Sequence, residues 1–120
     1  MSIGKVGAVV LDCPDPVALA RFYAELVGGT VEDDGDGWVD LKGADGAQLA
    51  FQAAAGHVPP KWPSAKDSQQ FHIDVMVEDM DAAEERVLAL GATTLDAEDR
   101  KRSFRVYADP AGHPFCLCAC

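Results

Sequence analysis

The sequence predicts an α+β protein that is built from two copies of a β-α-β-β-β module. An apolar run followed by a helical pattern occurs twice along the 120 residues. Each helical pattern is followed by short segments in which apolar and polar residues alternate, which is typical of strands. A segment rich in proline and glycine separates the two copies. We therefore expect one domain over residues 1–120, with modules at about 5–53 and 70–119 and a linker at 54–69.

The first module begins with an apolar run over residues 6–14, which predicts a buried strand. Asp15 and Pro16 predict the start of a helix, because a short carboxylate can accept the free N–H groups of the first turn and proline needs no N–H there. The pattern over residues 16–26 carries one apolar stripe that suits packing on a sheet, and Gly28 ends the helix.

Three strands complete this module, at residues 29–32, 38–41 and 47–52. The turns between them, at 33–37 and 43–46, contain glycines, which adopt positive φ without steric cost. The alternation of apolar and polar residues predicts strands that each bury one face.

The second module repeats this order. An apolar run over residues 71–78 precedes Asp79, which we expect to cap a helix over 81–90 that ends at Gly91. The three strands are expected at residues 92–95, 103–107 and 113–118, the last of them after an Asp-Pro-Ala-Gly turn at 109–112.

The charge of the chain excludes several kinds of partner. With 20 Asp and Glu against 10 Lys and Arg, the formal net charge is −10, so the phosphates of DNA or RNA would be repelled. No apolar run approaches the roughly 20 residues that a membrane helix needs. The N-terminal residues lack the features of a signal peptide. We expect a cytoplasmic protein that binds neither nucleic acid nor membrane.

The cysteines agree with that location. Cys13 stands alone, and Cys116, Cys118 and Cys120 alternate at the C-terminus. Side chains two residues apart on a strand lie roughly 6.5–7 Å apart. This is too far for a disulfide, whose Cβ atoms are about 3.8 Å apart. We therefore expect reduced thiols.

Three parts of the chain resemble the vicinal oxygen chelate superfamily, which comprises glyoxalases, bleomycin-resistance proteins and dioxygenases. They are residues 11–16 with Phe22, Tyr23 and Leu26, residues 72–75 with 79–83, and residues 109–115. Within the superfamily, the chain is most similar to small proteins with a glyoxalase-like domain. The resemblance implies two βαβββ modules that each surround half of a cleft, and it implies a homodimer.

The resemblance also implies where a metal would be held. Metal-dependent members carry four ligands, on the first and fourth strands of both modules. The matching positions here are Ala8, Ala50, His72 and Cys116. Alanine offers no lone pair, so we expect no standard metal site and no cofactor. A histidine and a thiolate could still hold a divalent metal, and an alternative register would add Gln52 and Cys118.

Strand alternation predicts which side chains face the cleft. The expected cleft face mixes acids, amides, thiols and one imidazole, as small-molecule sites often do. The opposite face is apolar throughout and should pack under the helices. Its residues are Val9, Leu11, Leu49, Phe51, Ile73, Val75, Phe115 and Leu117.

The candidate ligand-binding residues are His72, Asp74, Asp12, Gln52, Cys116 and Trp62. His72 either serves the site or simply bonds Asp74 or a neighbouring strand. Asp74 orients His72, meets a cationic ligand group or is merely solvated, and Asp12 has the same alternatives. Cys116 is either a thiol activated by the imidazolium or a small hydrophobe.

Two further side chains have open interpretations. Trp62, among the prolines of the linker, is a lid over the cleft, a dimer contact or a structural plug. Arg105 binds an anion if it faces the cleft, and otherwise it is a surface charge.

We expect the protein to bind a small molecule in its cleft without a standard metal site, as bleomycin-resistance proteins do. One alternative is a metal-dependent lyase, isomerase or dioxygenase of the same superfamily. Another is a metal-free enzyme that uses His72 and Asp74 as an acid/base pair.

Overall fold

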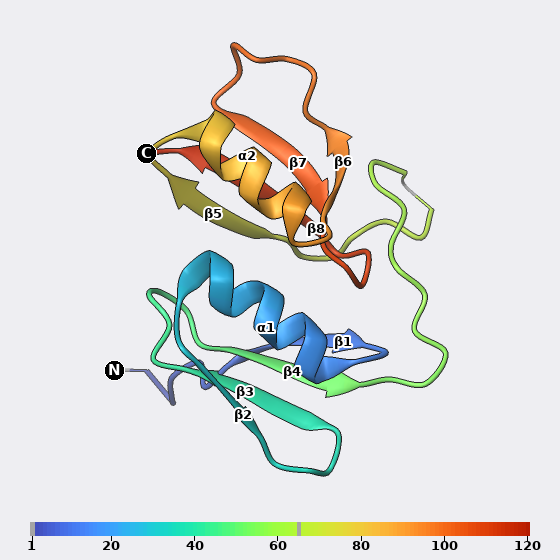
Figure 1. The fold of residues 1–120 in the computed structure, drawn as a ribbon. Coiled ribbons are helices and arrows are strands. Elements are labelled where there is room, and N and C mark those ends of the chain that lie inside the picture. Colours follow the sequence, from blue (N-terminus) through green and yellow to red (C-terminus); the bar gives the residue numbers. More distant parts are fainter. Residues whose placement is uncertain (1, 65) are drawn as a thin grey trace. The chain divides into compact units, whose positions relative to one another are not determined.

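The computed structural model describes residues 2–64 and 66–120. The chain forms two compact units, one ending at His57 and the other beginning at Val58. Each unit is a four-stranded mixed sheet with one helix packed on one face (Figure 1). The predicted fold class of two βαβββ modules is confirmed. Neither helix is long and apolar enough to cross a membrane.

The first module contains strand β1 (Val9–Cys13), helix α1 (Pro16–Val27), and strands β2 (Thr30–Asp33), β3 (Trp38–Lys42) and β4 (Leu49–Ala53). The strand order is β1-β4-β3-β2, with β1 parallel to β4 and the other pairs antiparallel. Asp15 caps α1 as expected, because its Oδ1 accepts a hydrogen bond from the Ala18 N–H at 3.1 Å.

The second module contains strand β5 (Ile73–Val77), helix α2 (Met80–Ala89), and strands β6 (Thr93–Asp96), β7 (Phe104–Ala108) and β8 (Pro114–Ala119). The strand order β5-β8-β7-β6 repeats that of the first module, again with a single parallel pair. Asp79 caps α2 in the same way, with Oδ1 3.1 Å from the Ala82 nitrogen.

The apolar face predicted for the strands forms the core, with one exception. Its members Leu11, Leu49, Phe51, Val75, Phe115 and Leu117 are buried, and Ile73 is half-buried. The prediction for Val9 is wrong, since its side chain is 42% exposed. Val9 is the first residue of the edge strand β1, whereas helix α1 packs mainly on β2, β3 and β4.

Both interpretations of Arg105 are also wrong. Its side chain points to the helix-covered face of the sheet and is only 4% exposed. It pairs with two acidic residues of α2, Asp81 at 2.9 Å and Glu84 at 3.6 Å. Of the residues of α2, all of which the structure describes, Val87 alone is buried. The second helix is therefore held to its sheet largely by polar contacts.

Candidate functional site

A pocket of about 540 Å³ lies on the face of the second sheet that α2 does not cover. Strands β5, β7 and β8 supply most of its walls, and the segment before β5 supplies the rest. Its lining residues are Trp62, Gln69, His72, Asp74, Met76, Ser103, Phe104, Val106, Pro114, Cys116, Cys118 and Ala119. Aromatic, aliphatic, sulfur and polar groups are thus combined in one concave surface.

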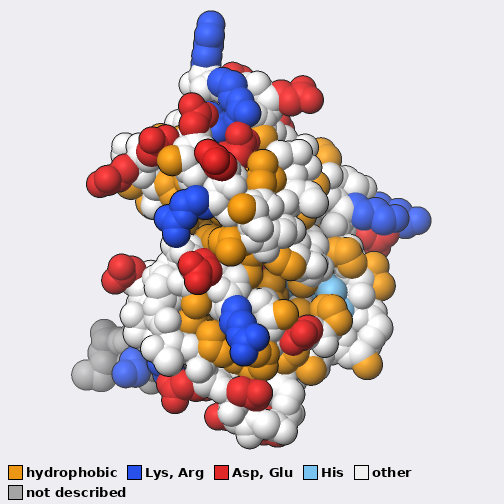
Figure 2. All heavy atoms as spheres, in the orientation of Figure 1, with side chains coloured by type: hydrophobic (Ala, Val, Ile, Leu, Met, Phe, Trp, Pro, Cys, Tyr) orange, Lys and Arg blue, Asp and Glu red, His pale blue; other side chains and the backbone are white. Residues whose placement is uncertain are grey.

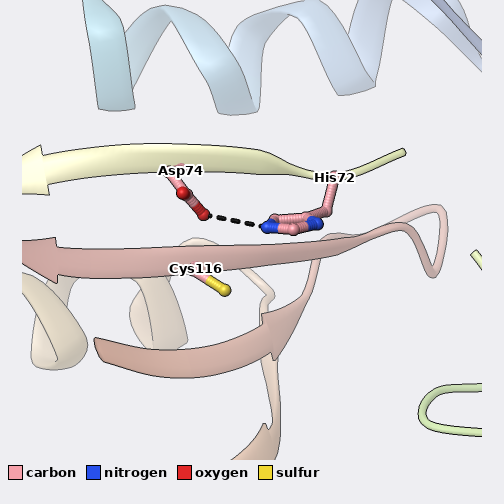
Figure 3. A group of neighbouring side chains, drawn as sticks. All are labelled: His72, Asp74 and Cys116. Atoms are coloured by element: carbon pink, nitrogen blue, oxygen red, sulfur yellow. Dashed lines mark ion pairs between the residues drawn. The ribbon is translucent and has the colours of Figure 1, made fainter. Parts of the chain in front are cut away.

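His72, Asp74 and Cys116 form a cluster in this pocket (Figure 3). His72 directly precedes β5 and Asp74 lies two residues further on, so both side chains point to the same face. The Nε2 of His72 lies 3.1 Å from Oδ1 of Asp74. Cys116 is the register partner of Asp74 on β8. One donor atom from each of the three lies within 4.8 Å of the others.

The electrostatics of the pocket keep the thiols of Cys116 and Cys118 protonated. Burial and the negative charge of Asp74 raise the pKa of Cys116 to about 12. The same two causes raise the pKa of Cys118. The side chains of His72 and Asp74 are 41% and 54% exposed, so their ion pair is open to solvent. Burial and the charge of Asp74 thus oppose ionisation of Cys116, which favours its interpretation as a small hydrophobe over that of an activated thiol.

This arrangement predicts the order in which the thiols react. With iodoacetamide at pH 8, we expect the exposed Cys120 to be labelled first and Cys116 at least about tenfold more slowly, since the thiolate is the reacting form. Peptide mapping by mass spectrometry would measure each rate.

Asp74→Asn should speed the labelling of Cys116 and Cys118, because it removes the charge that opposes their ionisation. Glu78→Gln, which removes an exposed carboxylate next to β5, is the matched control and should change neither rate. Equal rates for Cys116 and Cys120 in the unmodified protein would contradict this account.

Trp62 reaches the pocket from the segment that leads into β5. This segment is folded back on itself, with the Lys61 N–H donating to the Asp67 carbonyl at 2.7 Å. It also packs on the turn before β8, where Pro59 lies so close to Gly112 that a Cβ there would overlap it. The structure therefore brings Trp62 to the same pocket as His72 and Asp74.

Asp12 and Gln52 are not part of this pocket. They lie in the first module, on β1 and β4, where they are register partners and both exposed. Four of the six candidate residues thus line one pocket in the second module, and the other two are neighbours in the first. All six remain predictions as ligand-binding residues.

Gln69 and Phe104 line the pocket but were not among the candidates. Gln69 precedes β5 outside any periodic pattern, so alternation gave no signal for it. Phe104 could have been found from strand register, because it is the β7 partner of Cys118.

The donor set does not fit the four-ligand metal site that the resemblance implies. Ala8 and Ala50, at the two positions in the first module, have no donor atom. His72, Asp74 and Cys116 would be the residues available to hold a divalent ion within the second module. A cluster of imidazole, carboxylate and thiolate would suit a borderline metal such as Zn²⁺.

The paired βαβββ sheets and the pocket on one of them define a protein of the glyoxalase, bleomycin-resistance and dioxygenase class. The chain belongs to the glyoxalase-like domain family, whose model matches residues 8–118. It is therefore a member of the vicinal oxygen chelate superfamily. No curated protein matches the chain.

Solved structures share the fold over nearly the whole chain. The fosfomycin resistance protein FosX from Mesorhizobium loti has a TM-score of 0.72 at 15% identity, covering 98% of this chain and 92% of that one. A glyoxalase/bleomycin resistance protein/dioxygenase family enzyme from Burkholderia phytofirmans PsJN has a TM-score of 0.68 at 18% identity, covering 93% and 95%. A glyoxalase-related enzyme from Fulvimarina pelagi has a TM-score of 0.67 at 21% identity, covering 98% and 89%. At these identities the likeness shows the fold.

Proposed function

We propose that the protein binds a small molecule in the pocket of its second module, in the manner of a bleomycin-resistance-type sequestering protein. The observation that carries this proposal is the composition of the pocket. Apolar and aromatic side chains such as Trp62, Phe104 and Val106 form its walls, and the His72–Asp74 pair supplies polar groups. A cavity of about 540 Å³ is within the usual range for small-molecule sites.

A ligand screen with matched variants tests this proposal. We expect members of a library of small aromatic compounds to raise the melting temperature, with the strongest then measured by isothermal titration calorimetry. Asp74→Asn should weaken that binding by about tenfold, because hydrogen bonds to a charged group contribute the most to affinity. Glu78→Gln should leave the affinity unchanged, since Glu78 is exposed and does not line the pocket. The proposal fails if no compound binds, or if the two variants bind equally well.

A second candidate function is a metal-dependent lyase, isomerase or dioxygenase. The observation that favours it is the placement of one donor atom each from His72, Asp74 and Cys116 within 4.8 Å of one another. Elemental mass spectrometry of the untagged protein, purified under reducing conditions, separates the two candidates. Near one divalent metal per chain, lost in His72→Ala, would favour the metal-dependent enzyme. No bound metal after incubation with Zn²⁺, Ni²⁺, Fe²⁺ and Mn²⁺ would favour sequestration.

A further inference from the structure

The pocket contains a buried hydrogen-bond acceptor that has no partner. The Oε1 of Gln69, one of its lining residues, is buried and has no hydrogen-bond partner. A buried acceptor without a partner is unfavourable, so such atoms in native proteins call for a specific explanation. The second acceptor is the half-exposed carboxylate of Asp74, which lies 3.1 Å from His72 and also hydrogen-bonds with the thiols of Cys116 and Cys118.

The one basic side chain among the described lining residues is His72, which is already paired with Asp74. The described residues that line the pocket include neither lysine nor arginine. The guanidinium of Arg102 lies 4.1 Å from the centre of the Phe104 ring, but it is already paired with Asp96 at 3.1 Å. The chain as a whole has a formal charge of −10, and Figure 2 shows acidic and basic side chains together on the face that it presents. An anionic ligand would therefore find only basic groups that are already paired with carboxylates, whereas a cation would be attracted.

We propose that Gln69 determines ligand specificity by accepting a hydrogen bond from an N–H donor, and that the ligand is a flat aromatic amine or amidine in its cationic form. This inference rests on the proposed binding function. The aromatic body of the ligand packs between the hydrophobic walls that include Trp62 and Phe104. Its N–H groups meet the Gln69 oxygen and the Asp74 carboxylate, so that the buried Gln69 oxygen gains the partner it lacks.

Three probes of one shape test the class of ligand. Benzamidine is a planar cation with several N–H donors, benzamide is neutral with two, and benzoate is an anion with none. Titration of the ¹⁵N-labelled protein, followed by chemical-shift changes, gives each affinity and shows which residues respond. We expect benzamidine to bind most tightly and benzoate least, with shifts at His72, Met76 and Cys118.

Variants of Gln69 test its role. Gln69→Met keeps the length of the side chain and removes the acceptor, and it should weaken benzamidine by about fivefold. Gln69→Glu keeps the acceptor and adds a negative charge, so it should restore or exceed the original affinity. Gln70→Met is the matched control, because Gln70 is exposed and does not line the pocket.

Each other outcome overturns a specific part of this inference. If benzamidine binds the pocket equally well in Gln69→Met, Gln69 does not determine specificity, although the binding function stands. If none of the three probes binds while other compounds of the library do, the assigned ligand class is wrong. If no compound perturbs the pocket, the proposed function fails together with this inference.

Discussion

Arg105→Ala is expected to lower the free energy of unfolding by about 3 kcal/mol, the lower end of the range for removing one partner of a buried ion pair. The side chain is 4% exposed and lies between strand β7 and helix α2. Removing it leaves the half-buried carboxylate of Glu84 with less positive charge and leaves a cavity beneath the helix. Urea denaturation would measure the loss.

The effect is large because α2 has few apolar contacts with the sheet. Helix α1 buries Leu19, Phe22 and Tyr23, whereas α2 buries Val87. In place of a wide apolar stripe, α2 has Glu84, whose Oε1 accepts a hydrogen bond from the hydroxyl of Tyr107 at 2.8 Å. Pairing with Arg100 opposes the effect of burial and holds the pKa of Glu84 below its ordinary value, so the carboxylate stays charged at neutral pH.

Arg100→Ala is the matched control for this prediction. Arg100 also pairs with Glu84, at 2.9 Å, but its side chain is 54% exposed. Exposed ion pairs contribute little, so this variant should lose less than about 1 kcal/mol. Arg105→Lys should recover part of the loss, because it restores the charge without the planar guanidinium. Similar losses in the two alanine variants would contradict a special role for the buried arginine.

The case of Arg105 shows what strand alternation can and cannot predict. Alternation correctly separates the two faces of the strands, because neighbouring side chains must point in opposite directions. It assigns Arg105 and Tyr107 to one face and Phe104 and Val106 to the other. Which face is buried depends on the partner groups, and Asp81, the nearest partner of Arg105 in space, lies 24 residues away in the sequence on α2. An arginine without a visible partner is expected to be at the surface, and this expectation failed.

The architecture was predictable because its signals are local. The caps Asp15 and Asp79 accept hydrogen bonds from residues three positions further on, and the glycine turns span about four residues. The residues that determine where each element ends therefore lie close together in the sequence. Each strand and helix was accordingly expected within a few residues of its observed limits.

The pocket was less predictable, since its members come from separate segments. Because the two modules repeat one pattern, equivalent strand positions in both were expected to face the cleft. Asp12 and Gln52 were therefore predicted as site residues alongside His72 and Asp74. The side chains that line the pocket all belong to the second compact unit, which begins at Val58. Gln69 and Trp62 enter it from an irregular segment, where neither periodicity nor register assigns a direction to a side chain.

Gly112→Ala is expected to displace the segment that carries Trp62 and to lower the free energy of unfolding by about 3 kcal/mol, from left-handed backbone strain together with overpacking. Gly112 has φ +93°, and a Cβ there would overlap the Cβ of Pro59 and lie 2.9 Å from its Cγ. The turn cannot yield easily, because the Asp109 side chain accepts hydrogen bonds from the Ala111 and His113 nitrogens at 2.8 and 3.0 Å. The Pro59 segment must therefore move.

Gly35→Ala separates the two causes. Gly35 has φ +82° and no atom within 4 Å of an added Cβ, so this variant should lose only about 1 kcal/mol from backbone strain.

The movement of Trp62 can be followed by fluorescence. The other tryptophan, Trp38, lies in the first module, so a Trp38→Phe background makes the fluorescence report on Trp62 alone. Gly112→Ala should shift that emission to the red and increase its quenching by acrylamide, because Trp62 leaves the pocket wall. In the Gly112→Ala/Pro59→Gly variant the overlap is removed, and the emission should return toward its original position. If both glycine variants lose the same stability and the Trp62 emission does not change, the contact between Pro59 and Gly112 does not hold Trp62 at the pocket.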